Sequence, residues 1–185
     1  GSIQSTAPRA VGIFTDNNSG LIQNNSQIEL LGDKSIGIYA VQNTANIFNG
    51  GTIKVGNSSD ISDSSIGIYS ANTTDSITNN GTIETGLKSL GIYSLGTQTD
   101  HNGILIVGDS GTGIFKENGI LNVNSGSQIN VGTAEAVGIY VKSATANMAS
   151  GAGMTVANGS DGAFLESGSG LSNAANIVLS DNSIF

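Results

Sequence analysis

The side chains that could do acid–base or metal chemistry are few in this chain of 185 residues. His101 is the single histidine, and Asp100 beside it is a neighbour only in sequence. Both lie in the segment TDHNG, residues 99–103, which has the composition of a turn. No Ser–His–Asp arrangement has independent support. We therefore expect His101 to be a turn residue rather than a catalytic base or a metal ligand.

The aspartates are spread along the chain, mainly between the expected strands. They are Asp16, Asp33, Asp60, Asp63, Asp75, Asp100, Asp109, Asp161 and Asp181. Enzymes that cleave glycans use paired or clustered carboxylates, often beside Arg or Lys. Arg9 is the only arginine, and Gly-Asp repeats that bind Ca²⁺ are missing. The pattern favours solvated turn carboxylates, with no catalytic residue, no metal and no cofactor.

The composition and charge of the chain limit the kinds of partner that it is expected to bind. The net charge is −8 with six basic residues, which argues against nucleic acid and against docking on anionic lipid. The absence of cysteine rules out disulfide scaffolds and thiolate zinc sites. No run of 18 apolar residues is present, so we expect no membrane insertion by this segment. The leading Gly1-Ser2 suggests a cloning remnant on an excised fragment.

A Gly-Ile-Tyr type motif recurs through the chain and is the main structural signal. Its glycines are Gly12, Gly37, Gly67, Gly91, Gly113, Gly138 and Gly162, and NSIF at residues 182–185 starts an eighth copy. The spacings between successive glycines are 25, 30, 24, 22, 25 and 24 residues. Short strands at such a period cannot bury a core alone, but stacked copies can.

Three apolar columns appear when the copies are aligned on that glycine. The first flanks it, as in Ile66/Ile68; the second lies about ten residues on and comprises Ile22, Ile47, Ile77, Val123, Met148 and, one place early, Leu171. The third is a pair 16 and 18 residues on, as in Ile53/Val55. We expect all three to face the core, because alternation is typical of half-buried strands.

These columns predict an all-β fold, a right-handed parallel β-helix of about seven coils. Each coil has roughly 25 residues and three short strands, and residues 1–185 form a single solenoid segment. Right-handedness follows from the preference of parallel crossovers. Asn and Gly precede the third strand in successive coils, and we expect Asn49, Asn79 and His101 to share one corner with stacked side chains.

Nearly all the aromatic residues fall in one position of the repeat. The column is Phe14, Tyr39, Tyr69, Tyr93, Phe115, Tyr140 and Phe164, with Phe185 as an expected extension. Alternation with the inward isoleucines sends these rings outward or into a corner. We expect adjacent rings to stack at the coil spacing and to stabilise neighbouring coils.

The second coil is the longest, and its excess falls at residues 56–65, where the chain reads GNSSDISDSS. An insertion in a repeat becomes a loop on one face, which is a frequent place for binding. The candidates are Asn57, Asp60 and Asp63, the last two for a cation or a polar ligand. The alternative, which the pattern favours, is a solvated lengthening of the loop that binds nothing.

The repeats in SIGIYSANTTDSITNNGTIETG, residues 65–86, resemble those of type V autotransporter passengers, in particular the large outer-membrane adhesins of fusobacteria. The resemblance covers essentially the whole chain. It implies a Sec-exported β-helical passenger on the bacterial surface, attached to the outer membrane through a barrel domain outside this chain. It maps no binding residue.

From these observations we expect a non-enzymatic segment of a cell-surface adhesin, a stalk that presents loops to a protein or glycan receptor on host or bacterial cells. The alternatives are a β-helical polysaccharide lyase or hydrolase, and a structural spacer with no ligand. Strand edges open at both ends would also allow the rods to associate with one another.

Overall fold

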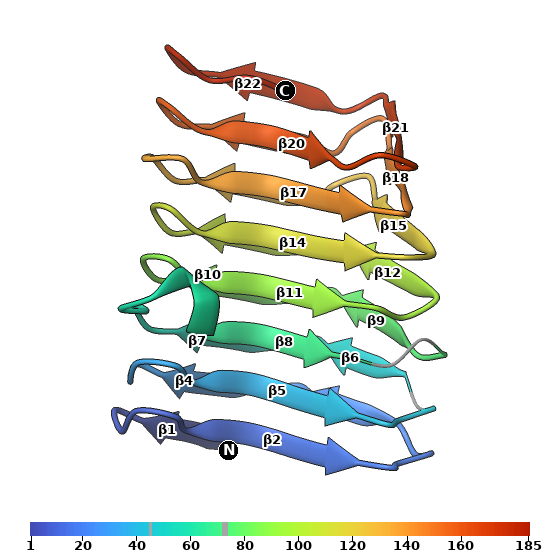
Figure 1. Cartoon of the computed structure of the whole chain (residues 1–185). Coiled ribbons are helices and arrows are strands. Elements are labelled where there is room, and N and C mark those ends of the chain that lie inside the picture. Colours follow the sequence, from blue (N-terminus) through green and yellow to red (C-terminus); the bar gives the residue numbers. More distant parts are fainter. Residues whose placement is uncertain (45, 72–73) are drawn as a thin grey trace.

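The computed structural model describes residues 1–44, 46–71 and 74–185. The chain winds into a stack of coils, and each full coil gives one strand to each of three parallel sheets (Figure 1). Strands pair with the equivalent strands one coil below and above, as β5 does with β2 and β8. The predicted all-β parallel solenoid of about seven turns, with three strands per turn, is confirmed.

Over the described residues the three sheets hold eight, seven and seven strands. Sheet A consists of β1 (Ser2–Ser5), β4 (Gln27–Leu30), β7 (Thr52–Val55), β10 (Thr82–Thr85), β13 (Ile104–Val107), β16 (Gln128–Val131), β19 (Gly153–Val156) and β22 (Asn176–Leu179). Sheet B consists of β2 (Val11–Asp16), β5 (Ile36–Val41), β8 (Ile66–Ser70), β11 (Leu90–Ser94), β14 (Thr112–Glu117), β17 (Val137–Lys142) and β20 (Asp161–Leu165). Sheet C consists of β3 (Ile22–Asn24), β6 (Ile47–Asn49), β9 (Ser76–Asn79), β12 (Gln98–His101), β15 (Ile120–Val123), β18 (Thr145–Met148) and β21 (Gly170–Asn173).

The sense of the winding can be followed in Figure 1. Sheet B faces the viewer with its strands running to the right, β22 of sheet A runs to the left behind it, and the chain climbs from the N-terminus to the C-terminus. This sense is right-handed, which is the preferred hand of parallel crossovers. A short 3-10 helix, η1 (Ile61–Asp63), interrupts the pattern between β7 and β8.

Sheet A fills its side of the core as the third column predicts. Ile53 and Val55 of β7 are buried, and the register sets them on Ile28 and Leu30 below and on Ile83 and Thr85 above. Branched side chains at alternate positions suit this arrangement because they pack well on a pleated surface. The result is a continuous stack of apolar side chains along the rod axis.

The expectation that both neighbours of the motif glycine enter the core is wrong for the first neighbour. Ile68 is fully buried, whereas Ile66 is half-buried on the outer face of sheet B. Gly67 itself is turned inward, so two successive positions face the core and the alternation is interrupted. A Cβ atom on Gly67 would lie 2.6 Å from the carbonyl oxygen of Gly91 and 2.8 Å from Ile83 Cγ2. Glycine is therefore required by the next coil and by the core, not by the aromatic column.

The second column is also only partly correct. Ile22, Ile47 and Ile77 are continued by Thr99, Leu121, Ala146 and Leu171. Val123 and Met148 instead belong to the next inward position, in line with His101. The turn from sheet B to sheet C is two residues shorter in the fourth to sixth coils than in the first three. A fixed spacing of ten residues from the glycine therefore selects the wrong side chain there.

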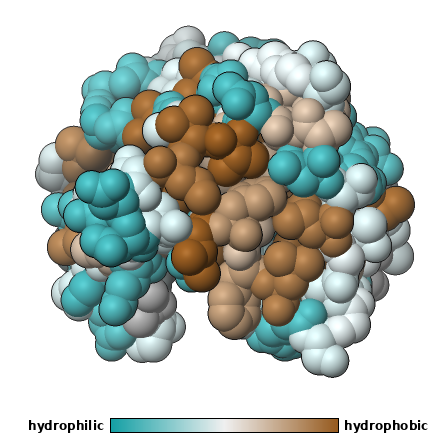
Figure 2. All heavy atoms as spheres, turned by 90° about the horizontal axis from the view of Figure 1, so that it is seen from above, coloured by the Kyte–Doolittle hydropathy of each residue, from teal (hydrophilic) through white to brown (hydrophobic). Residues whose placement is uncertain are grey.

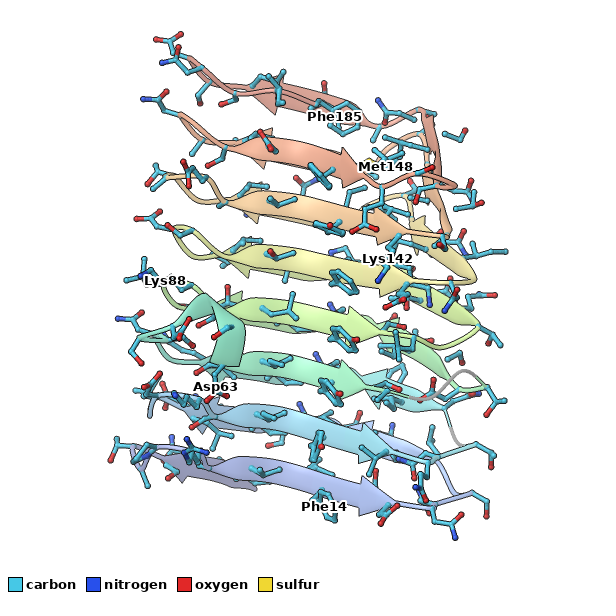
Figure 3. The ribbon with its side chains drawn as sticks, in the orientation of Figure 1. Phe14, Asp63, Lys88, Lys142, Met148 and Phe185 are labelled. Atoms are coloured by element: carbon cyan, nitrogen blue, oxygen red, sulfur yellow. The ribbon has the colours of Figure 1, made fainter. Side chains whose placement is uncertain are left out.

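The C-terminal residues begin an eighth coil, as NSIF predicts. Ile184 forms a parallel bridge with Asp161, which sets Phe185 over Gly162. Phe185 therefore does not extend the aromatic column; it lies in the glycine column, and Figure 3 labels it above β20, close to the upper end of the rod. Among the described residues no helix is long and apolar enough to span a membrane.

The glycine column gives a stability prediction. Gly67→Ala should lower the free energy of unfolding by about 2 kcal/mol, because the added methyl group has no space between two coils. Gly170→Ala is the matched control, since its Cβ would meet nothing nearer than 3.9 Å. Urea unfolding of both variants measures the difference. Equal stabilities would show that the coils do not approach as closely as the structure has them.

Candidate functional site

The seven aromatic rings stand in one column on the outer face of sheet B. Adjacent ring centroids lie 4.8 to 5.6 Å apart, and Figure 3 labels Phe14 at the lower end of the column. Tyr69, Tyr93 and Phe115 are nearly parallel, with interplanar angles of 8° and 5°. Burial beneath the neighbouring rings raises the pKa of Tyr69 and of Tyr93. The contacts between adjacent rings hold each coil to the next.

The segment 56–65 between β7 and β8 is folded against the coils on both sides of it. The amide of Leu87, one coil above, donates to Asn57 Oδ1 at 2.9 Å. The amide and hydroxyl of Ser59 donate to the carboxylate of Asp33, one coil below, at 3.0 and 2.8 Å. Ser58 is buried, and its hydroxyl lies 3.2 Å from that of Ser89. The segment is therefore hydrogen-bonded to both neighbouring coils, although most of its described side chains remain exposed.

Asp60 and Asp63 each have a partner within the protein. Asp60 caps η1, accepting a hydrogen bond from the amide of Ser62 at 2.9 Å, and this bond lowers the pKa of Asp60. Asp63 forms an ion pair with Lys34 at 2.8 Å and lies 3.8 Å from Arg9. The structure therefore does not gather Asn57, Asp60 and Asp63 around one ligand. Within residues 1–44, 46–71 and 74–185, no His/Asp/Glu group could hold a metal ion.

A groove lies between this segment and the aromatic column. It encloses about 180 Å³ and is lined by Ser64, Lys88, Ser89, Leu90, Tyr93, Thr112 and Phe115. Figure 2 shows the molecule along the rod axis with a notch at its lower edge, on the side where η1 projects in Figure 1. Figure 3 labels Lys88 at the turn above η1. Sequence reasoning pointed to the segment and to the column but not to the hollow that they enclose.

Two further hollows follow the outer face of sheet A. One, of about 350 Å³, is lined by Gln4, Ser5, Thr6, Glu29 and Leu31. The other, of about 270 Å³, includes Leu31, Lys54, Asn57 and Glu84. Lys54 is paired with Glu84 at 2.8 Å, so its charge is already matched within the protein. The first hollow therefore carries the negative charge of Glu29, and in the second the charges of Lys54 and Glu84 cancel.

His101 is not a turn residue, contrary to the expectation. It is the last residue of β12, it is fully buried, and it completes a ladder of side chains along the rod axis. Asn24 Nδ2 donates to Asn49 Oδ1, and Asn49 Nδ2 donates to Asn79 Oδ1, each at 2.7 Å. Asn79 Nδ2 lies 3.1 Å from His101 Nδ1. The expected shared corner of Asn49, Asn79 and His101 is confirmed, but its side chains point inward.

The ladder fixes the state of the imidazole. Asn79 Nδ2 is a donor, so His101 Nδ1 must accept, and Nε2–H donates to the carbonyl of Gln128 at 3.3 Å. A proton on Nδ1 would face the amide donor of Asn79. Burial lowers the pKa of His101 to about 4. The ring is therefore a neutral structural group.

A second buried polar group was not predicted at all. Lys116 of β14 is fully buried, and its Nζ donates to Ser94 Oγ at 3.0 Å and to the carbonyl of Gly96. Asp75 is also buried; it is not the solvated turn carboxylate that we expected, and it accepts a hydrogen bond from Ser70 Oγ. Burial lowers the pKa of Lys116 to about 8, although nearby Asp75 opposes the shift, and burial raises the pKa of Asp75.

The repeat alignment does contain the signal for Lys116. In sheet B the register places Lys116 directly above Ser94 and Ser70 and below Val141. A lysine in an inward column otherwise filled by small or apolar residues marks a buried charge. Its long side chain fills space that the short serines leave in the core.

Comparison with known protein families finds a match in the N-terminal part of the chain. Residues 1–90 match the family described as the BigA third pectate lyase-like domain. No curated protein and no solved structure matches the chain. The match supports an adhesin-like passenger region on a cell-surface protein, while the fusobacterial part of the resemblance stays a prediction.

The His101 ladder predicts a pH dependence. The unfolded chain binds a proton on His101 below about pH 6.5, and the folded protein does so only below about pH 4. The free energy of unfolding should therefore rise by about 3 kcal/mol from this group between pH 4 and 6.5. His101→Asn should keep the ladder and remove that contribution. Chemical unfolding at several pH values measures it, and an unchanged pH profile in the variant would contradict the assignment.

Lys116 and Asp75 should be coupled energetically. Removing one charge leaves the other buried without its counterpart, whereas removing both relieves the desolvation of the pair. In a double-mutant cycle, Lys116→Met with Asp75→Asn should be about 1–3 kcal/mol more stable than the single variants predict by addition. Urea unfolding at pH 7 of the four proteins tests this. Strictly additive effects would mean that the two groups do not interact.

Proposed function

We propose that this chain is a non-enzymatic segment of a bacterial cell-surface adhesin. The observation that carries the proposal is the match of residues 1–90, on a parallel β-solenoid, to a domain of BigA, an autotransporter-type adhesin. In this proposal the rod holds recognition surfaces away from the outer membrane, to which a barrel domain elsewhere in the protein attaches it. The partner is a protein or glycan on a host or bacterial cell.

The contacts between successive coils suit a load-bearing stalk. Main-chain hydrogen bonds, the aromatic column and the asparagine ladder all run along the rod axis and join successive coils. Because main-chain hydrogen bonds and a ring contact join each of the seven full coils to the next, bending the rod would strain several of them at once. Such a rod transmits force and keeps its surface features at fixed spacing.

The acidic side chains support a structural rather than a catalytic role. Glu84 pairs with Lys54, Glu117 with Lys142 at 3.2 Å, and Asp63 with Lys34. Asp109 accepts hydrogen bonds from the amide of Thr133, one coil above. These carboxylates join one coil to the next, so their positions follow from the needs of stacking.

A polysaccharide lyase is the second candidate, because the matching family is described as pectate lyase-like. A lyase that acts on a polyanion needs cationic groups in its cleft to bind substrate carboxylates. Of the hollows on sheet A, one holds the carboxylate of Glu29, and in the other Lys54 is already paired with Glu84. This arrangement of charge disfavours an acidic substrate there and ranks the lyase below the adhesin.

The test compares adhesion with cleavage. The chain on fluorescent beads should bind host epithelial cells or bacterial cells saturably, with unlabelled chain competing. Incubation with polygalacturonate, with and without Ca²⁺, should release no unsaturated product. Saturable binding that falls when residues 60–63 of the segment are removed, with thermal unfolding unchanged, would support recognition by the loop face. Release of unsaturated product would establish the lyase instead. If no cell shows saturable binding, the role that remains for the chain is that of a structural spacer without a ligand.

A further inference from the structure

The groove between segment 56–65 and the aromatic column is formed by two departures from the repeat. The first is the insertion itself, which overhangs the outer face of sheet B and forms one wall. The second is Thr112 in its floor. The register places Ile66 and Leu90 in the same column, so the floor is lower where Thr112, which is about the size of valine, replaces a longer aliphatic side chain. The hollow lies where these two local changes meet.

The opposite wall presents the edges of aromatic rings. Tyr93 and Phe115 are parallel to within 5° with centroids 5.1 Å apart, so each covers part of the face of the other. What remains open to the groove is mainly ring edge, which carries positive partial charge. Sugars stack on aromatic faces, and those faces are covered here. An incoming aromatic ring, by contrast, can meet such edges with its own face in a T-shaped contact.

The groove has one charged lining residue, Lys88. Lys88 belongs to none of the ion pairs between described residues; its ammonium interacts electrostatically with Asp60 of the segment, but at a longer distance than an ion pair. This ammonium at the rim favours a ligand that carries a carboxylate. The volume of about 180 Å³ is below the roughly 300 Å³ of pockets that enclose a drug-sized ligand, and it suits a single side chain.

We propose that this groove binds an aromatic side chain of a partner protein, with an adjacent Asp or Glu of the partner paired to Lys88. Leu90 and Thr112 form the floor under the ring, and Tyr93 and Phe115 contact its face with their edges. An aromatic anchor in a small pocket beside a charge is typical of the residues that dominate protein interfaces. The inference rests on the proposed adhesin function and names a protein segment as its partner.

Peptide titrations followed by NMR test the groove directly. The probe is acetyl-Gly-Phe-Asp-Gly-amide, and the controls are the same peptide with Ala for Phe or Asn for Asp. The probe should shift the signals of Lys88, Leu90 and Phe115 saturably, and each control should bind more weakly by about threefold or more. Glucuronic acid is the glycan probe. Shifts from glucuronic acid that exceed those from the peptide, or peptide shifts confined to other faces, would overturn the proposal.

Two variants test whether the peptide binds in the groove. Thr112→Phe fills the floor and should weaken the peptide about tenfold; Lys88→Asn removes the charge and should weaken it about threefold. Asparagine tolerates the positive φ of 54° at position 88. The matched controls are Thr155→Phe on the outer face of sheet A and Lys142→Asn, neither of which should change the affinity. Equal effects of the groove variants and their controls would contradict the site.

The same variants separate this inference from the proposed function. If the chain binds cells and Thr112→Phe and Lys88→Asn reduce that binding, both stand. If the chain binds cells and both variants bind as well as the unaltered protein, the adhesin proposal stands and the groove does not mediate it. If the chain binds no cell while the peptide still shifts the groove signals, the groove is a peptide site and the adhesin role of this segment fails.

Discussion

Successive coils of this protein lie at main-chain hydrogen-bonding distance, and the motif glycines are where that spacing leaves no room for a side chain. From Gly12 to Gly138, an added Cβ would lie less than 3.0 Å from the carbonyl oxygen of the glycine in the next coil. The strand bends inward there, and the alternation of inward and outward positions shifts by one. The following isoleucine then enters the core, and the aromatic ring after it points outward. The rod, its core and its aromatic column therefore share one geometric cause.

The same spacing determines how polar groups are tolerated inside the rod. A side-chain amide at one level can donate to the amide one coil away, so Asn24, Asn49 and Asn79 satisfy one another along the axis. His101 ends that series as a neutral ring. Lys116 works differently, because it reaches toward the level below to hydroxyl and carbonyl oxygens. Among the described residues, Asp75 Oδ1 is the buried side-chain atom left without a hydrogen-bond partner.

Much of the fold could be predicted from the repeat, because period and alternation report directly on stacking. The parallel solenoid, the sheet A pairs such as Ile53/Val55 and the stacking position of the rings follow from spacing alone. The predictions that were wrong concern positions that depend on local chain length and on contacts between coils. Val123 was misplaced because a turn shortens by two residues, and Ile66 because the bend at Gly67 is invisible to a rule of strict alternation. The groove was missed for a further reason: it needs an inserted loop and the shorter Thr112 to meet across different coils.

In this account, function depends on the places where the surface of the rod departs from the regular repeat. The repeat fixes where segment 56–65 and the aromatic rings lie, and the exceptions to the repeat create the hollow between them. The proposed role as an adhesin stalk depends on the support being one stiff rod in continuous register. If the coils were only loosely joined, the surface segments that bind a partner would not keep a fixed spacing. Force applied at the cell surface would then separate the coils.

That register can be measured by electron spin resonance between two spin labels. The chain has no cysteine, so Gln4→Cys and Thr155→Cys give two unique labelling sites. Both residues lie on the outer face of sheet A, and the register joins them through Glu29, Lys54, Glu84, Ile106 and Asn130. Six coil steps of about 4.8 Å predict a backbone separation of about 29 Å. A single narrow distribution at that spacing, allowing for the label arms, is the result that a continuous rod requires. A broad distribution, or one centred well away from it, would contradict the stacked architecture.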